Sequence, residues 1–316
     1  MLHSPHLLIP AAAHTSEACL SRMPTLVLPH LEQLLSRLLP DKVEEAATTT
    51  FSPPHERALA RAYGLPIDDG LIPWAAWQVQ QEHRGSNVEP WAWLTPCHWQ
   101  MGIDRATLLP PDTLQLSDSD ARTLIAAMQP YFEQDDIHLI YHTPARWLAR
   151  GEPLRSLQTA SLDRAVGQAV DTWLPRGPSA RTLRRLQSEM QMLLYTHPIN
   201  DERQRDGLLP VNSFWLSGSG HLPTTTDGEP PDLRVDYRLR DAALLDDWAA
   251  WADAWRVVDT QECARLLQEL DQGLPVTLTL CGESSARRYI AGPQTLWQRL
   301  TRNFQHQPLW KTLHTL

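Results

Sequence analysis

The chain has 316 residues, of which 42% are hydrophobic and 21% charged, and its formal net charge is −9. This composition is typical of a globular protein with enough apolar material for one large domain or two smaller ones. The negative net charge argues against nucleic acid as the main partner, because nucleic-acid binding needs a basic face. No apolar run reaches the roughly 18 residues that predict a membrane-spanning helix, so we expect no membrane partner.

The N-terminal part predicts a strand followed by helices. Residues 6–9 form a short apolar run of strand type, and leucines recur at helical spacing between residues 25 and 39. Ser52 is the expected cap of a helix that runs to about Tyr63, where Gly64 ends it.

The middle of the chain predicts a small α+β domain. Residues 91–107 alternate enough for two strands, Ser117 caps the helix that follows, and two more strands are expected between residues 136 and 149. His138 and His142 share a face of one of these strands. At strand spacing they lie about 13 Å apart, which is too far for one metal ion.

The stretch from Tyr195 to Gly220 combines the largest number of signals. A long amphipathic helix begins after Ser179 and ends at His197-Pro198, since the residue before a proline is disfavoured in a helix. A polar turn follows, then a buried strand at residues 211–216 and a loop at residues 218–221. In α/β folds, ligands bind at the carboxyl ends of such strands.

The C-terminal part predicts helices and one strand of parallel-sheet type. The expected elements are a loop at residues 224–231, helices at 239–255, 261–272 and 294–303, and the strand at 275–280. Trp248, Trp251 and Trp255 share one face of the first helix. Such a cluster either packs in the core or lines a binding surface, and both interpretations of the 13 tryptophans stay open.

Apolar strands that alternate with amphipathic helices predict an α/β fold with a mainly parallel sheet flanked by helices. We expect this core domain to comprise residues 1–88 and 176–316, and residues 89–175 to form a small inserted α+β domain. The main cleft is expected between the two domains. The side chains expected to line it are those of His197, Asn200, Arg203, Asn212, Ser219 and His221.

Two interpretations of this polar stretch remain open. In the first, Arg203 and Arg205 hold an anion such as a phosphate or a carboxylate, since guanidinium groups match both. In the second, the polar residues are structural: His197 and Asn200 bind loop backbone, and Asn212 forms a hydrogen bond to a neighbouring segment.

The spacing HP-x-N-x-x-R-x-x-x-G-x-x-P-x-N-x-x-x-x-x-G-x-G resembles that of the archaeal-type, cofactor-independent phosphoglycerate mutases, a branch of the alkaline-phosphatase-like superfamily. The matching residues are His197, Pro198, Asn200, Arg203, Gly207, Pro210, Asn212, Gly218 and Gly220. The whole chain also resembles proteobacterial proteins described as mutase-like or RpfE-type regulators. This resemblance implies an alkaline-phosphatase-like core with a small α/β insertion.

The resemblance further implies a site where two divalent metals activate a serine or threonine nucleophile. In the family, the first strand ends in an Asp-Gly pair and a late strand in an Asp-His pair, and both pairs bind metal. Here Ala11 to Ala13 and Gly282-Glu283 stand at those places. Asp253 and Asp259 are expected on solvated helix faces. The nucleophile candidates are Thr48, Thr49, Thr50 and Ser52.

We therefore expect no bound metal and no cofactor. The sequence favours a non-catalytic, mutase-like protein with a regulatory role, which binds a small anionic metabolite or a protein partner. The alternative is an active metal-dependent phosphoglycerate mutase or a related phosphatase.

The cysteines and the N-terminus indicate the cellular compartment. Cys19, Cys97, Cys263 and Cys281 are far apart in the sequence and form no CxxC pair, so neither a zinc ribbon nor a dithiol redox motif is expected. The first ten residues lack the basic region and the long apolar stretch of a signal peptide. Free thiols in a reducing cytoplasm fit these features best.

Overall fold

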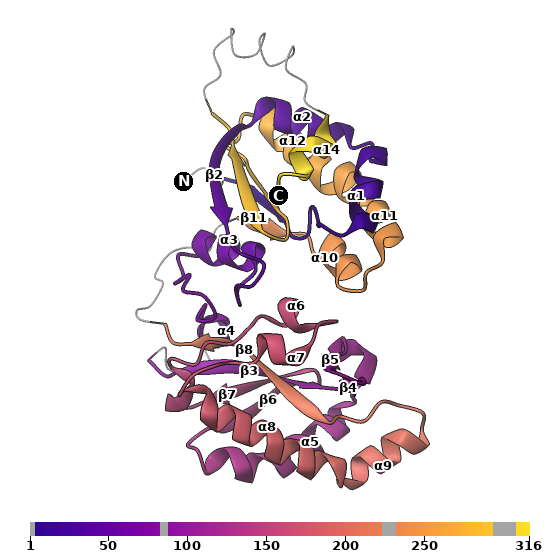
Figure 1. Cartoon of the computed structure of the whole chain (residues 1–316). Helices are drawn as coiled ribbons and strands as arrows, with labels where there is room; N and C mark the ends of the chain where they lie inside the picture. The colour runs from indigo at the N-terminus through magenta and orange to yellow at the C-terminus, as the bar shows by residue number, and fades with distance from the viewer. Residues whose placement is uncertain (1–3, 83–87, 223–231, 293–307) are drawn as a thin grey trace. The chain divides into compact units, whose positions relative to one another are not determined.

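The structure is a computed structural model, and it describes residues 4–82, 88–222, 232–292 and 308–316. The chain forms two compact units, which are described separately (Figure 1). The first unit comprises residues 1–49, 53–64 and 228–316, and the second comprises residues 50–52 and 65–227. The loop predicted at 224–231 and the helix predicted at 294–303 lie outside the described residues.

The first unit is built on a five-stranded sheet with the order β2-β11-β10-β1-β9. Its strands are β1 (His6–Ile9), β2 (Leu39–Glu45), β9 (Leu233–Val235), β10 (Thr277–Cys281) and β11 (Ser285–Ile290). β1 pairs in parallel with both β9 and β10, whereas β11 runs antiparallel to β10 and to β2. The unit is α/β, but its sheet is mixed rather than mainly parallel. The reason is local: a short turn joins β10 to β11, and only antiparallel strands can be joined that way.

Helices cover the two faces of this sheet unequally. Leu7, Ile9, Leu278 and Leu280 point into a large apolar core that six described α-helices share. These helices are α1 (Glu17–Arg22), α2 (Pro29–Arg37), α10 (Arg238–Ala243), α11 (Trp248–Val258), α12 (Ala264–Asp271) and α14 (Leu309–Leu313). On the opposite face, α3 (Pro54–Ala62) is the only one of the described helices that contributes to a small apolar cluster around Leu8. Much of that face is therefore polar.

The tryptophans of α11 belong to the core. α10 (Arg238–Ala243) precedes α11, so the single helix predicted at 239–255 is two helices. Trp248, Trp251 and Trp255 are buried, and their rings meet edge to face at centroid distances of 6.1 and 6.2 Å. No tryptophan is among the exposed side chains in the part of the chain that the structure describes. The core interpretation of the α11 cluster is therefore confirmed.

The second unit is built on a four-stranded antiparallel sheet with the order β6-β7-β3-β8. Its strands are β3 (Trp91–Cys97), β6 (His138–Thr143), β7 (Arg146–Arg150) and β8 (Ser213–Gly220). α5 (Asp118–Glu133) and α8 (Ala180–Tyr195) bury their apolar faces against the sheet in one core. As predicted, the side chain of Ser117 caps α5 by accepting a hydrogen bond from the Asp120 amide.

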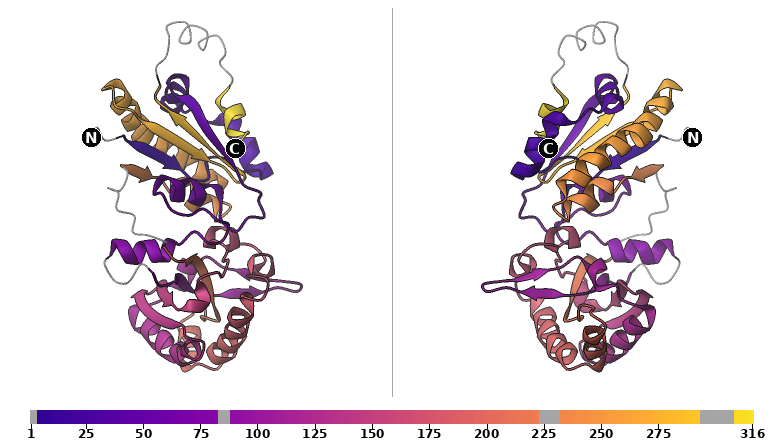
Figure 2. Two further views of the ribbon diagram at one scale, coloured as in Figure 1. Left: turned by 90° about the vertical axis from the view of Figure 1, so that its left-hand side faces the viewer. Right: turned by 90° about the vertical axis from the view of Figure 1, so that its right-hand side faces the viewer.

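Smaller elements complete the second unit. They are α4 (Trp74–Gln81), α6 (Leu162–Ala165), α7 (Val170–Trp173), α9 (Pro198–Arg205) and the hairpin of β4 (Trp99–Met101) with β5 (Ala106–Leu108). Figure 2 shows the hairpin extending outward from the rest of this unit. Within the described ranges, no helix of either unit has the length and hydropathy needed to cross a membrane.

The unit boundaries differ from the predicted ones. Residues 65–88 and 176–227 lie in the second unit, although the prediction assigned them to the core domain. The cause is β8, which was expected as a buried strand of the core domain. It pairs instead with β3 in antiparallel register, from Cys97 opposite Ser213 to Trp91 opposite Gly220. An apolar run of this length predicts a buried strand but does not identify its partner.

Candidate functional site

All six residues predicted to line a cleft lie in the second unit, around α9 and β8. The segment expected to be a polar turn after Pro198 is the helix α9. Its cap is His197, whose Nδ1 atom accepts a hydrogen bond from the Ile199 amide at 3.3 Å. Pro198 then occupies the first helical position, where its missing N–H costs nothing. His197 therefore has a local structural role.

Asn200 is 5% exposed and fixes the segment that leads into β8. Its side-chain amide donates to the carbonyl groups of Leu194 and Val211, at 2.8 and 2.7 Å, and its Oδ1 accepts from the Val211 amide at 2.9 Å. Three hydrogen bonds from one side chain hold the end of α8 against the start of the strand segment. This matches the structural interpretation of the residue.

Arg203 is 2% exposed, and its guanidinium is surrounded by protein acceptors. Nε donates to the Leu209 carbonyl at 3.0 Å, one terminal nitrogen donates to Asp120 Oδ2 at 3.0 Å, and the other donates to the Leu114 carbonyl. A buried charge requires such partners, because removing it from water is costly. Arg205, in contrast, is exposed; its Nε donates to the Asp201 carbonyl at 3.3 Å, and a terminal nitrogen lies 4.0 Å from the Glu202 carboxylate.

Asn212, directly before β8, and Ser219, near the end of β8, form hydrogen bonds to the backbone of neighbouring segments. Asn212 pairs with the main chain of Trp99, accepting from its amide at 2.7 Å and donating to its carbonyl at 3.0 Å. Ser219 is fully buried; its hydroxyl lies 2.9 Å from that of Thr159 and donates to the Leu157 carbonyl. His221 is half-buried and directly follows β8.

Two glycines of the motif are explained by backbone shape. Gly218 has a φ of 60°, and a Cβ there would lie 3.0 Å from the Trp93 ring. Gly220 has a φ of 137°, and a Cβ would lie 3.2 Å from the Leu71 carbonyl oxygen. Both positions require a residue without a side chain. The motif therefore specifies the backbone shape of β8 and the side chains that hold the neighbouring segments in place. Binding of an anion by Arg203 stays a prediction.

Among the parallel strands of the first unit, β1 and β10 offer few metal ligands at their carboxyl ends, whereas β9 is followed by Asp236, whose carboxylate pairs with Arg238 at 3.2 Å. β1 is followed by Pro10 and by Ala11 to Ala13, and β10 is followed by Gly282-Glu283. The Ala11 carbonyl accepts a hydrogen bond from the Trp251 indole at 2.8 Å, and the Ala12 amide donates to the Cys281 carbonyl at 2.7 Å. These contacts hold the loop in place without presenting a side-chain donor to a metal.

A small polar group does occur beside this loop. Glu283 accepts a hydrogen bond of 2.5 Å from the Thr15 hydroxyl, and His14 Nε2 lies 3.7 Å from the same carboxylate. The His14 ring also contacts the Trp248 ring at a centroid distance of 4.9 Å. Across the described ranges, no group of three or more His, Cys, Asp or Glu side chains is placed to hold a metal ion. These residues do not fit a two-metal site, which needs several ligands at once.

The carboxylates predicted on solvated helix faces are of two kinds. Asp253 is exposed and pairs with Arg256, as expected. Asp259 is 1% exposed, so its predicted position is wrong. It accepts hydrogen bonds from the Leu31 amide at 2.8 Å and from His30 Nδ1 at 2.9 Å, at the first turn of α2. A carboxylate there is stabilised by the unpaired amides and the dipole of the helix.

Two of the nucleophile candidates have hydrogen-bond partners. The Ser52 hydroxyl accepts from the Gly70 amide at 3.0 Å, and the Thr50 hydroxyl donates to the Ser52 carbonyl at 3.1 Å. Ser52 is also not the cap of α3, because Pro53 holds that position. These contacts agree with the interpretation of this segment as a polar linker.

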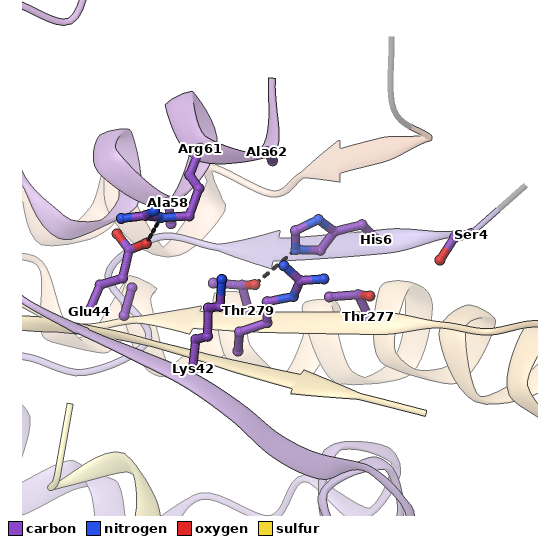
Figure 3. Close-up of a pocket in the computed structure, with 11 residues that line it drawn as sticks. Ser4, His6, Lys42, Glu44, Ala58, Arg61, Ala62, Thr277 and Thr279 are labelled. Atoms are coloured by element: carbon purple, nitrogen blue, oxygen red, sulfur yellow. Dashed lines mark hydrogen bonds and ion pairs between the residues drawn. The ribbon is translucent and has the colours of Figure 1, made fainter. Parts of the chain in front are cut away.

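The polar face of the first sheet contains a pocket that the sequence analysis missed. Figure 3 shows it between α3 and the strands, and its volume is about 280 Å³. We name it the sheet-face pocket; its lining residues are Ser4, His6, Lys42, Glu44, Ala58, Arg61, Ala62, Thr277, Thr279, Ala286 and Arg288. The alternation Thr-Leu-Thr-Leu in β10 was the available signal, since it predicts one polar face.

Comparison with known proteins gives a partial match. No family model matches the chain. It is 33% identical over 99 residues to the 2,3-bisphosphoglycerate-independent phosphoglycerate mutase of Methanothrix thermoacetophila, and 35% identical over 61 residues to the protein of the same name from Methanosarcina mazei. These matches cover 30% and 19% of this chain, but only 24% and 15% of the two curated relatives.

Among solved structures, the cofactor-independent phosphoglycerate mutase of Thermoplasma acidophilum matches 93% of this chain and 91% of its own. The identity is 12% and the TM-score is 0.38, which is too low to establish a common fold. The sequence matches are the stronger finding, and they name the same family as the nine motif residues between His197 and Gly220. The chain therefore resembles the archaeal-type, cofactor-independent phosphoglycerate mutases.

Proposed function

We propose that this chain is a mutase-like protein without phosphoglycerate mutase activity, which acts in regulation by binding a small anionic metabolite or a protein partner. We also propose that its first unit derives from the alkaline-phosphatase-like core. The observation that carries the proposal is the donor-poor loop after β1, where Ala11 to Ala13 stand in place of an Asp-Gly pair.

Loss of the metal ligands removes the charge that phosphoryl transfer requires. A divalent cation needs several oxygen ligands held at once, and each missing carboxylate leaves it under-coordinated. In the family's reaction, the metals neutralise the phosphoryl oxygens and activate the attacking hydroxyl. Glu283 is the one acidic side chain that follows β10 directly, and its carboxylate accepts a hydrogen bond from the Thr15 hydroxyl. The shortage of carboxylates after β1 and β10 supports loss of the phosphoryl-transfer reaction that the resemblance implies.

The alternative is an active metal-dependent mutase or a related phosphatase. One contact favours it: the Thr15 hydroxyl donates to the Glu283 carboxylate, and a hydroxyl beside a base is the usual arrangement of an activated nucleophile. The cysteines offer no such candidate. All four are buried, and burial raises the pKa of each thiol, which suppresses the reactive thiolate.

The absence of disulfides among the four cysteines supports a reducing compartment, and we propose a cytoplasmic location. The formal net charge of −9 supports the view that nucleic acid is not the partner.

The test combines metal analysis with an activity assay on the full chain. The purified protein is expected to contain no stoichiometric manganese, magnesium or zinc, and to show no turnover of 3-phosphoglycerate when each metal is supplied. Turnover that disappears on chelation and returns with metal would overturn the proposal. In that case Glu283→Gln should abolish it, whereas Asp253→Asn on the exposed face of α11 should leave it unchanged.

A further inference from the structure

The sheet of the first unit has one apolar and one polar face. Leu278 and Leu280 of β10 lie in the helix-covered core, so Thr277 and Thr279 point to the opposite face. These threonines are only 6% and 3% exposed. Strands buried on both faces usually carry apolar side chains. Buried hydroxyl groups at this position indicate a site built for polar contacts.

The strand register places two cations beside each other on this face. Thr279 lies opposite Arg288 of β11, and Arg288 in turn lies opposite Lys42 of β2. Directly opposed like charges destabilise a strand pair. The Asp41 carboxylate lies 3.4 Å from Arg288 and offsets part of the repulsion between the two cations. An anion placed between Lys42 and Arg288 would remove the remaining repulsion.

The lining of the sheet-face pocket is rich in donors and poor in free acceptors. It contains the cations Lys42, Arg61 and Arg288 but only one carboxylate, that of Glu44, which pairs with Arg61. Neither the Lys42 ammonium nor the Thr277 hydroxyl has a hydrogen-bond partner within the ranges that the structure describes. Figure 3 shows both side chains at the strands that border the pocket.

His6 adds a neutral polar group. Its Nε2 atom lies 2.8 Å from the Thr279 hydroxyl. Burial lowers the pKa of its imidazole to about 4, and the positive charge of Arg288 contributes in the same direction. The groups around it are Arg288 on β11, Lys42 and Glu44 on β2, and Arg61 on α3. At neutral pH the ring is uncharged, so it adds a polar contact but no charge to the pocket.

We propose that the sheet-face pocket binds a small metabolite with an oxyanion group, a phosphate ester or a carboxylate, held by Lys42, Arg288 and Thr277. Ala58 and Ala62 of α3 and Ala286 of β11 form a wall that leaves room for a short carbon skeleton. The pocket lining runs from His6 and Thr277, at the amino-terminal ends of β1 and β10, to Ala286, which lies opposite Cys281. This inference rests on the proposed ligand-binding function and names the class of ligand.

The experiment titrates inorganic phosphate, and separately acetate, into the isotope-labelled full chain at constant ionic strength, with backbone amide shifts as the readout. Saturable shifts are expected at His6, Thr277 and Thr279 with at least one of the two probes. Lys42→Gln should weaken binding about tenfold, the loss expected for one charge-assisted contact. Lys311→Gln removes the same charge from the exposed side of α14 and should leave the affinity unchanged.

A second variant tests the pocket without changing its charge or the strand propensity of the residue. Thr277→Val preserves the shape and strand propensity of the residue, and should weaken binding several-fold. Absence of saturable shifts with both probes, or equal affinity in wild type and Lys42→Gln, would refute the inference. Either result would leave binding of a protein partner open. Metal-dependent turnover in the mutase assay would refute the proposed function alone, so the two failures are distinguishable.

Discussion

Arg203 and Lys42 show two different uses of a positive charge in one chain. Arg203 is 2% exposed and donates to three protein oxygens, whereas Lys42 is exposed and has no partner in the described part of the chain. The motif that carries the family resemblance contains Arg203, and the sheet-face pocket contains Lys42. The difference teaches that a cation inside a motif can be structural. A cation outside it can be the one available to a ligand.

The largest expected change in stability comes from removing the buried charge of Arg203. Arg203→Met should destabilise the second unit by about 3–5 kcal/mol, because it leaves the Asp120 carboxylate and the carbonyl groups of Leu209 and Leu114 without their buried donor. Urea denaturation followed by circular dichroism measures this change. Arg205→Met is the matched control on the same helix, and it should change the free energy of unfolding by less than about 0.5 kcal/mol. Equal effects of the two variants would contradict the structural assignment of Arg203.

The next effect depends on pH and concerns His6. Its folded-state pKa of about 4 lies below the unfolded value of 6.5, so the unfolded chain binds the proton more strongly. The stabilising contribution of the neutral ring is complete above pH 6.5 and is lost as the pH falls toward 4. Between pH 7 and pH 5 the wild type should lose about 2 kcal/mol more stability than His6→Gln. Urea midpoints at the two pH values measure this, and identical pH dependence of both proteins would refute the depressed pKa.

The smallest effect has the opposite sign. Lys42→Gln removes one of two like charges that face each other across β2 and β11, so it should leave the first unit as stable as before or more stable by up to about 0.5 kcal/mol. Thermal unfolding in a buffer without phosphate measures the change. With saturating phosphate, the wild type should regain this difference, since a bound ligand stabilises the folded state. A clear destabilisation of the variant without phosphate would show that Lys42 has a structural partner.

Local signals in the sequence predicted many elements correctly. The apolar runs gave β1 and β10, the Ser117 cap gave the start of α5, and the leucine and methionine spacing gave α8 up to the His197-Pro198 stop. Each of these depends on contacts between residues close in sequence, or on a periodicity that one element carries alone. The family resemblance was also available from the sequence, through the motif of residues 197–220.

The tertiary structure alone decided which segments pair and which charges are buried. β8 was recognised as a strand, but its place beside β3 depends on residues more than a hundred positions away. β2 and β11 were missed because their polar residues interrupt the apolar pattern, and those residues line the sheet-face pocket. Asp259 and Asp253 lie six residues apart, and only the position of α2 buries one of them. Pairing and desolvation are non-local, so the sequence determined the elements, and packing determined which polar groups remain available to a ligand.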